Sequence, residues 1–367
     1  MVRIFHIADI HAGREFRGFG PFAKTLRKQI LATFRKTIET ARAAGADAVV
    51  VAGDLFDKAQ PDRADREAVW AAIGDGGLPV VVLPGTHDLL KPTSPYLADT
   101  THPKNLLVVK NAPVILPGVG IAIHGRAQAQ FDGQALGNIR ALSEIPVNIA
   151  TAHASIPRAD IAAAEAEVLV TQAQIEATGA RYCALGHWHT CYEAFPGSPV
   201  PTWYSGSPEP VQFDGDSGYA LEVEIAPQQT TITRRLVGRY RWSTHEIDVR
   251  TMTNTEEVRA AIRVLAGPDR IVWVRFRGPI APTAAFDADQ MEDALAEGFA
   301  YLRLDPAGVQ MQAEGLNPDR LFTPGTVGNA FVTLAKTQRD AAAEADHPFW
   351  DAVIRRGTAV LSGGESV

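Results

Sequence analysis

The stretch Val2-Arg3-Ile4-Phe5-His6-Ile7-Ala8-Asp9-Ile10-His11 joins a short apolar run to an aspartate and a histidine. A second apolar run, residues 48–52, leads into Gly53-Asp54-Leu55-Phe56-Asp57, and a third, residues 79–83, precedes Gly85-Thr86-His87-Asp88. Short runs rich in β-branched residues predict strands. Each of these predicted strands therefore ends in a loop that carries side chains able to do chemistry.

The segment between the first two predicted strands has the pattern of an amphipathic helix. Gly45 is a natural end for it. The apolar residues that share one face of this helix are Leu26, Ile30, Phe34, Ile38 and Ala41. The other runs that we predict as strands in this half are residues 106–109, 120–124, 147–152, 182–185, 203–205, 218–225 and 230–237. Strands separated by helices predict a layered α/β domain in which helices cover a sheet core.

The 367 residues of the chain exceed what a single core usually holds, so we predict more than one domain. Composition changes near Tyr240, and a smaller α+β pattern follows. Its predicted strands are residues 244–249, 270–277 and 301–304, and its predicted helices are residues 254–265 and 288–297. We predict three parts: residues 1–240, residues 241–306, and a partly helical segment 307–367 with a helix over residues 329–345.

Composition and charge narrow the class of protein. With 46% hydrophobic and 21% charged residues, the chain has the composition of an ordinary globular protein. The net charge of -7 provides no general attraction to DNA or to anionic membranes, although local patches can act differently. Two cysteines exclude a disulfide framework, and no apolar run approaches the roughly 18 residues of a membrane span. We therefore expect a cytoplasmic protein without a membrane partner.

Two further loops carry histidines directly after predicted strands. His153 ends the run 147–152, and Gly186-His187-Trp188-His189 follows the run 182–185. Alone, each of the five loops is weak evidence, because a single histidine after a strand is usually structural. Together they predict one site, since ligands bind at the carboxyl ends of strands in α/β folds.

Oxygen and nitrogen ligands without a thiolate suit manganese, iron, zinc or magnesium. Two such ions, about 3.5–4 Å apart, can clamp a phosphoryl group and share a hydroxide nucleophile. His87 is not needed as a ligand, which makes it a candidate for protonating the leaving oxygen, with Asp88 orienting it. The pattern therefore predicts a two-metal phosphoesterase that uses two divalent ions, for which Mn²⁺, Fe²⁺, Zn²⁺ and Mg²⁺ are the candidates.

The order of these motifs resembles that of the calcineurin-like metallophosphoesterases over residues 2–210. The extra C-terminal part and the run Tyr182-Cys183-Ala184-Leu185-Gly186-His187-Trp188-His189 look like the DNA-repair exonuclease branch, which includes the SbcD and YhaO nucleases. This resemblance implies a four-layer α/β/β/α sandwich with a smaller α+β C-terminal capping domain.

The resemblance also implies a set of metal ligands. One metal would be held by Asp9, His11, Asp54 and His189, and the other by Asp54, Thr86, His153 and His187. Thr86 departs from the family, which usually has asparagine there. There are three interpretations: a weaker or more exchangeable second metal, which is favoured, a changed metal preference, and an inactive descendant. The last is disfavoured because every other ligand is present.

The substrate that we predict is DNA. The lysine and alanine after Asp57 differ from the protein phosphatases, and the part after Tyr240 is larger than small phosphodiesterases generally carry. Arg14 and Arg17 follow the first motif in a loop that also contains phenylalanines 16, 19 and 22. Such a loop can contact phosphates and stack on unpaired bases, and a solvated loop and helix face with core phenylalanines is the alternative. His124 is a further candidate to line the site, although a structural role is the favoured interpretation.

The resulting prediction is a two-metal DNA exonuclease, with endonuclease activity as an addition, acting in repair or recombination. A phosphodiesterase for nucleotides or other small esters and a non-catalytic DNA-end-binding subunit are the alternatives. The relatives imply an SMC-like ATPase partner, for which the helix near Phe331 is the place to look, and a homodimer.

Overall fold

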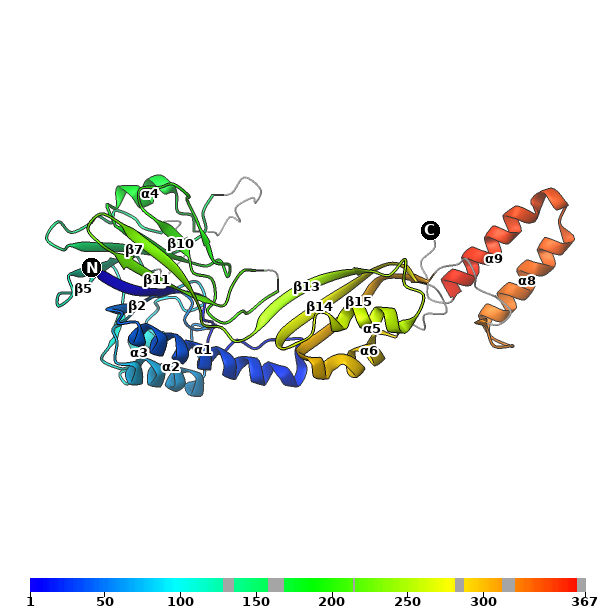
Figure 1. The fold of residues 1–367 in the computed structure, drawn as a ribbon, viewed down its shortest axis with the longest axis horizontal. Helices are drawn as coiled ribbons and strands as arrows, with labels where there is room; N and C mark the ends of the chain where they lie inside the picture. The colour runs from blue at the N-terminus through cyan, green and yellow to red at the C-terminus, as the bar shows by residue number, and fades with distance from the viewer. Residues whose placement is uncertain (128–134, 158–167, 214, 281–286, 312–320, 362–367) are drawn as a thin grey trace. The chain divides into compact units, whose positions relative to one another are not determined.

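The computed structural model describes residues 1–127, 135–157, 168–213, 215–280, 287–311 and 321–361. Contacts within the chain divide it into two compact units, Met1–Arg241 and Trp242–Val367 (Figure 1). Every helix among the described residues is too short or too polar to cross a membrane.

The first sheet of the N-terminal unit has the strand order β12-β11-β1-β2-β3-β4. Its four parallel strands are β1 (Val2–Ile7), β2 (Ala48–Ala52), β3 (Val80–Leu83) and β4 (Leu106–Val108). The antiparallel strands that complete it are β11 (Tyr219–Ile225) and β12 (Thr230–Leu236). All residues of β2 and β3 are buried, as expected for parallel strands covered on both faces.

The second sheet of this unit has the order β5-β6-β7-β8-β10-β9. Its parallel strands are β6 (Ile121–His124), β7 (Val147–His153), β8 (Tyr182–Gly186) and β10 (Thr202–Tyr204). Short antiparallel strands, β5 (Val114–Leu116) and β9 (Tyr192–Glu193), form its edges. Neither edge strand was predicted from the sequence.

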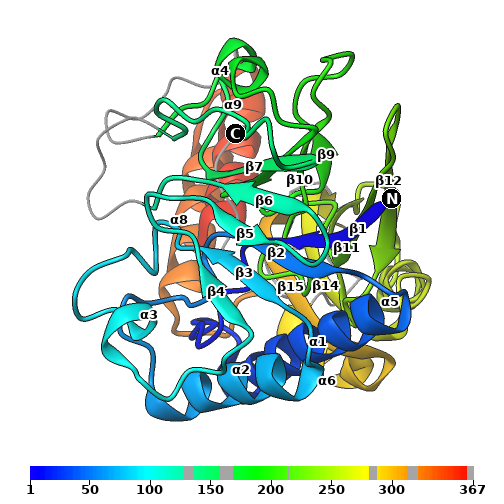
Figure 2. The same ribbon diagram turned by 90° about the vertical axis from the view of Figure 1, so that its left-hand side faces the viewer.

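The two sheets face each other across a buried core. Val50 and Val81 of the first sheet belong to the same core cluster as Ile123 and Ile149 of the second. The helices on the far side of the first sheet are α1 (Ala23–Ala43), α2 (Arg63–Gly76) and α3 (Pro95–Ala98), whereas α4 (Gln172–Ala177) lies over the second sheet (Figures 1 and 2). A single 3-10 turn, η1 (Gly20–Phe22), precedes α1. The predicted four-layer α/β/β/α arrangement is therefore confirmed.

The layers bring the carboxyl ends of the two sheets together. Nδ1 of His153, the last residue of β7, lies 2.9 Å from the carbonyl oxygen of Ala52, the last residue of β2. This bond joins strands that are 101 residues apart in the sequence. The loops after β1, β2, β3 and β8 therefore start from one edge of the sandwich.

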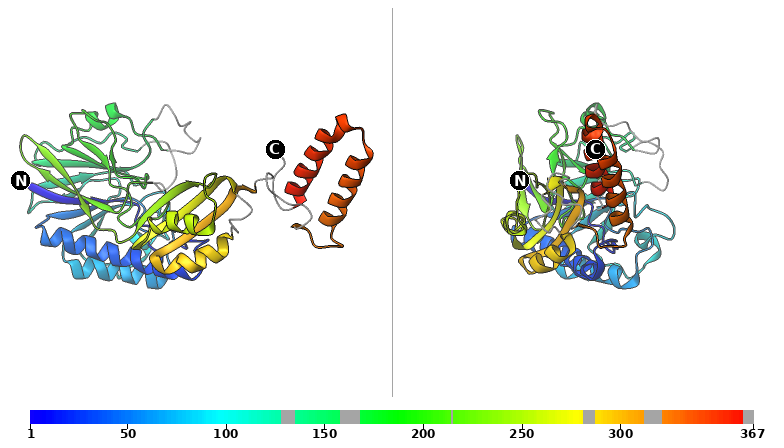
Figure 3. Two further views of the ribbon diagram at one scale, coloured as in Figure 1. Left: turned by 45° about the vertical axis from the view of Figure 1, so that its right-hand side comes forward. Right: turned by 90° about the vertical axis from the view of Figure 1, so that its right-hand side faces the viewer.

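The C-terminal unit contains a three-stranded sheet in the order β13-β14-β15, with β14 parallel to β15. The bounds are β13 (Arg241–Asp248), α5 (Thr255–Arg263), β14 (Gly267–Ile280), α6 (Ala288–Leu295), η3 (Ala296–Gly298) and β15 (Phe299–Met311). Val258 and Ile262 of α5 share a core with Met291 of α6 and with Val274 and Leu302 of the sheet. Both helices lie on the same face of this sheet (Figure 3).

Two antiparallel helices complete the described chain, α8 (Val327–Ala341) and α9 (His347–Leu361), joined by η4 (Glu344–Asp346) (Figure 3). They pack tightly: a Cβ added at Gly357 would lie 2.1 Å from the ring of Phe331. The sequence predicted one helix here, over residues 329–345, and the second was missed. The finer division of this unit at residue 306 stays a prediction, and residues 312–320 and 362–367 lie outside the described chain.

Candidate metal centre

The loops that leave β1 and β2 run side by side. The amide of Asp9 donates to the Gly53 carbonyl at 3.1 Å, and the amide of His11 donates to the Asp54 carbonyl at 3.0 Å. Asp9, His11 and Asp54 have φ values of 54°, 50° and 50°, and His187 has 106°. Such backbone costs on the order of 1–3 kcal/mol per residue and is concentrated at functional sites. The fold thus maintains strain at the positions that were predicted to bind metal.

Two glycines allow these loops to approach one another. A Cβ at Gly53 would lie 2.0 Å from Nδ1 of His153, and a Cβ at Gly85 would lie 2.2 Å from Oδ1 of Asp54. Gly53 also has a φ of 101°, a conformation that L side chains rarely adopt. Any larger residue at either position would push the loops apart.

Carboxylate and imidazole side chains gather where the loops meet. Within the described part of the chain, three groups of three bring their ligand atoms within 4.8 Å of one another. Their members are Asp9, His11 and His189; His11, Asp57 and His87; and Asp9, Asp54 and His153.

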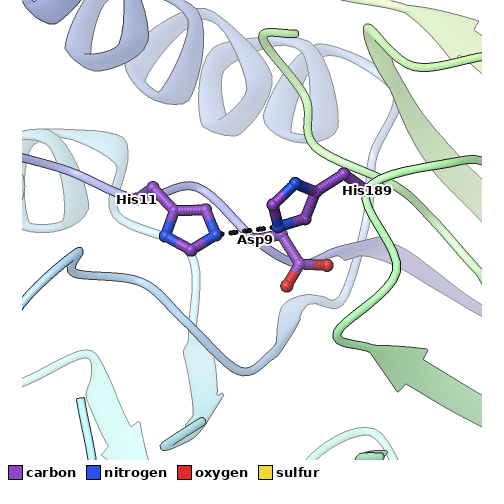
Figure 4. Close-up of side chains that lie close together, drawn as sticks. All are labelled: Asp9, His11 and His189. Carbon is purple, nitrogen blue, oxygen red and sulfur yellow. Dashed lines mark hydrogen bonds between the residues drawn. The ribbon is translucent and has the colours of Figure 1, made fainter. Parts of the chain in front are cut away.

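The first group directs two imidazole nitrogens at each other. Nδ1 of His11 lies 3.0 Å from Oδ1 of Asp57, and Nδ1 of His189 lies 3.1 Å from Oε1 of Gln212. The Gln212 oxygen accepts a hydrogen bond, so the His189 ring carries its proton on Nδ1 and presents the Nε2 lone pair. The buried Nδ1 of His11 makes no hydrogen bond within the described part of the chain. The two Nε2 atoms are 3.0 Å apart beside Asp9 (Figure 4). The two nitrogens are within hydrogen-bond distance, and together with the Asp9 carboxylate they are donors of the kind that a divalent cation binds.

The third group surrounds Asp54. Its Oδ2 lies 3.2 Å from Nε2 of His153, and the hydroxyl of Thr86 donates to the same oxygen at 3.2 Å. The His187 ring meets the His153 ring edge to face, with centroids 5.3 Å apart. The amide of His187 donates to both carboxylate oxygens of Asp9 at 3.1 Å. All seven predicted ligands therefore line this edge, although His187 belongs to none of the groups found among the described residues.

Burial and pairing set the protonation of these groups. Burial raises the pKa of Asp9 to about 6. Burial alone would raise the pKa of Asp54 as well, but the charge and hydrogen bond of His153 hold it well below its ordinary value. Burial opposes a charge on His153, yet Asp54 outweighs burial and raises the pKa of His153 to about 10. Burial lowers the pKa of His189 to about 3. A cation at Asp54 must therefore replace a proton on His153.

We expect the affinity for Mn²⁺ to rise with pH from about pH 6, where Asp9 becomes ionised, to about pH 10, where His153 becomes neutral. Each bound cation that displaces one proton gains about tenfold in affinity per pH unit in this window. Calorimetric titrations in two buffers of different ionisation enthalpy measure the proton release directly. Affinity that does not change with pH, with no proton released, would contradict this assignment of charge.

His87 lies at the rim of the centre and is exposed. Its Nδ1 is 3.0 Å from the Asp57 carbonyl oxygen, which can only accept, so this nitrogen carries a proton. The His87 amide donates to Oδ1 of Asp54 at 2.8 Å. The backbone is thus tied to the centre while Nε2 is left for a substrate, the geometry expected of a proton donor.

Asp88 was predicted to orient the His87 ring, but its carboxylate contacts other groups. Its carboxylate accepts from the amides of Gly85 at 2.7 Å and Phe56 at 3.1 Å, and from the hydroxyl of Tyr96. It is fully buried, and burial raises its pKa. These contacts brace the loop that carries His87, and the orienting contact to the His87 ring comes from the Asp57 carbonyl instead.

The predicted substrate-binding residues are not all together. Arg14 lies 3.5 Å from Oδ1 of Asp57, beside the centre, and Arg17 is 89% exposed on the same loop. His124 is buried and bonds to Asn148 at 2.8 Å. It lines a separate hollow and belongs to none of the three groups above, so the structure lends its structural alternative more support.

Asp57 and Gln212 were missed by the sequence prediction. Asp57 contacts the His11 ring through its carboxylate and the His87 ring through its carbonyl. Its place three residues after Asp54 was a usable signal. Gln212 had none, because its partner His189 is 23 residues away.

Residues 2–191 match the calcineurin-like phosphoesterase family. This match covers more than half of the chain, and the chain belongs to that family. The prediction made from the five motifs is confirmed at this level.

Two curated relatives are DNA repair proteins. The chain is 27% identical over 237 residues to the DNA double-strand break repair protein Mre11 of Methanopyrus kandleri, covering 58% of this chain and 50% of the relative. It is 26% identical over 276 residues to the protein of the same name from Aeropyrum pernix, covering 68% of this chain and 64% of the relative. The chain thus spans between half and two thirds of the length of these relatives.

Among solved structures, the protein TT1561 of Thermus thermophilus aligns with a TM-score of 0.42 and 13% identity, covering 64% of this chain and 98% of its own. A predicted phosphoesterase of Streptococcus pneumoniae aligns with a TM-score of 0.27 and 12% identity, again covering 64% of this chain and 98% of its own.

Proposed function

We propose that this protein is a two-metal DNA exonuclease, with endonuclease activity as well, that acts in DNA repair or recombination. The observation that carries the proposal is the convergence of imidazole nitrogens and carboxylates at one edge of a calcineurin-like sandwich. The similarity to two DNA double-strand break repair proteins supports DNA as the substrate.

Asp54 is the residue that both cations would share in this proposal. The first cation would be held by Asp9, His11, Asp54 and His189, and the second by Asp54, Thr86, His153 and His187. Mn²⁺ suits these oxygen and nitrogen donors, and Fe²⁺, Zn²⁺ and Mg²⁺ are the alternatives. Two such ions supply a hydroxide nucleophile and neutralise charge on a phosphoryl group.

The protein's own contribution to the reaction comes from His87. In the doubly protonated ring, the Asp57 carbonyl holds the proton on Nδ1, and Nε2 gives the second proton to the oxygen that leaves the phosphate, which returns the ring to its neutral form. Asp88, through Gly85 and Phe56, keeps this loop in place. In this proposal the residues that hold the loop are buried and do not contact the substrate.

Cleavage of end-labelled linear DNA by the purified protein with Mn²⁺ tests the function. An exonuclease shortens the linear DNA and spares a covalently closed circle, whereas endonuclease activity also nicks the circle. Faster turnover of cyclic nucleotides than of DNA would select the small-ester alternative. Salt-sensitive DNA binding without any cleavage would select the non-catalytic subunit.

Replacing Thr86 by asparagine is expected to raise the affinity for the second Mn²⁺ by about tenfold. The threonine hydroxyl lies 3.2 Å from Oδ2 of Asp54, and an asparagine amide oxygen would be a better ligand at this place. Calorimetry resolves the two binding events, and the first should not change. The same substitution at the exposed Thr101 is the matched control. Equal affinities in wild type and Thr86→Asn would mean that residue 86 does not bind the metal.

The helices α8 and α9 carry the proposed site for an SMC-like ATPase partner. Val327, Leu334 and Phe349 of these helices are 77%, 62% and 64% exposed, and exposed apolar side chains of this size can be covered by a protein partner. A homodimer and a cytoplasmic location also belong to the proposal. Co-purification of an ATPase with wild type but not with Leu334→Asp would support the partner.

A further inference from the structure

A hollow of about 480 Å³ opens directly beside His87. From the candidate centre, only His87 and Asp57 reach its wall. The apolar side chains that line the hollow are those of Phe16, Phe19 and Val211. The hollow therefore lies on the side of the centre where His87 is placed, away from the cation groups around Asp54.

The wall of this hollow is aromatic. Phe16 is buried, with 6% of its surface exposed, and its φ of 52° is a strained backbone conformation for a residue with a side chain. The Phe19 ring meets the Phe16 ring edge to face, with centroids 6.1 Å apart. Phe213 lies nearly parallel to Phe19, at 6.3 Å and 13°. Residues from two distant segments thus build one aromatic surface, and Phe19 is the half-buried member that lines the hollow.

The three cations at the rim, Arg14, Arg17 and Lys58, are paired with two acids, Glu15 and Asp57. Lys58 and Arg17 both contact Glu15, at 2.8 Å and 2.9 Å. The Arg14 guanidinium lies 5.8 Å from the centre of the Phe16 ring. Aromatic rings inside a rim whose cations are already paired with acids suit a flat, polar heterocycle better than they suit a phosphate alone.

We propose that this hollow binds the nucleobase of the nucleotide whose oxygen leaves the phosphate. The inference rests on the proposed function, and the side is assigned by His87, which lines the hollow and faces the leaving oxygen. A base can enter only after it has left its neighbours in the duplex, so the protein should prefer frayed or single-stranded ends. The hollow would therefore select substrates with an unpaired base, and this selection needs no sequence-specific contact.

The experiment uses DNA with one cleavable linkage, all others being nuclease-resistant phosphorothioates. The nucleotide on the leaving-group side carries either its base or a tetrahydrofuran abasic sugar. Wild type should cleave the intact substrate about tenfold faster than the abasic one. Phe19→Ala should lose this preference, giving a ratio near one. Phe195→Ala is the matched control, because Phe195 is also half-buried but packs against the core of the second sheet, and this variant should keep the wild-type ratio.

Three results would overturn the inference. The first is a wild-type ratio near one, and the second is an unchanged ratio in Phe19→Ala. The third is the same loss when the abasic sugar is on the opposite side of the cleaved phosphate. Absence of any DNA cleavage by wild type would instead overturn the proposed function, and the base-binding hollow with it.

Discussion

Asp54→Asn is expected to abolish Mn²⁺-dependent DNA cleavage, with a loss well above a hundredfold. Removing a residue that merely orients a ligand typically costs about 10- to 100-fold, and Asp54 is proposed to bind both cations. Its two oxygens have different neighbours, since Oδ1 accepts from the His87 amide at 2.8 Å and Oδ2 faces His153 at 3.2 Å. Asparagine preserves the size of the side chain but removes its charge and one acceptor.

A second readout separates loss of metal from loss of fold. The raised pKa of His153 depends on the Asp54 charge, so Asp54→Asn should lower it and remove proton release on Mn²⁺ binding. Circular dichroism and thermal unfolding should show a folded variant. Asp75→Asn, on α2 at an exposed ion pair with Arg35, is the matched control and should cleave like wild type. Undiminished cleavage by Asp54→Asn would exclude the proposed centre.

The candidate metal centre could be predicted from the sequence because each of its ligands lies close in sequence to a recognisable strand. Each candidate ligand follows an apolar run by a few residues, as Asp9 follows β1 and Asp54 follows β2. Parallel strands place their carboxyl ends at one edge, so local order along the chain becomes proximity in space. The strand predictions needed only β-branched runs, which buried parallel strands provide.

What could not be predicted depends on contacts between distant residues. Asp88 bonds to Phe56, which is 32 residues away, and this bond fixes its oxygens away from the His87 ring. Sequence adjacency to His87 favoured the wrong partner. In the same way, nothing near Gln212 indicated that its amide holds His189.

Prolines explain the errors in the C-terminal unit. We predicted a strand over residues 301–304, whereas β15 extends to Met311 and includes Pro306. Proline lacks a backbone donor but is tolerated in edge strands, and β15 lies at the edge of its sheet. Pro348 likewise obscured α9, although proline is favoured in the first turn of a helix.

His87→Gln is expected to lower the turnover of DNA by about 10²- to 10⁴-fold, the usual contribution of a positioned general acid. Glutamine keeps a donor that can reach the Asp57 carbonyl, now 3.0 Å from Nδ1, but it has no proton to give at neutral pH. Mn²⁺ affinity should stay within about twofold of wild type, because His87 is not among the proposed ligands. Steady-state kinetics and calorimetry on the same preparation measure both quantities.

The leaving group provides the sharper test of His87. A substrate in which sulfur replaces the leaving oxygen needs no proton, so His87→Gln should cleave it at nearly the wild-type rate. His102→Gln, on the loop before β4 with Nδ1 3.4 Å from the Pro103 carbonyl, is the matched control for both substrates. An equal loss with oxygen and sulfur leaving groups would show that His87 binds the phosphate rather than protonating the leaving group. Because the base-binding hollow is assigned to the leaving side only through this proton transfer, that result would also remove the assignment of side while leaving the two-cation centre intact.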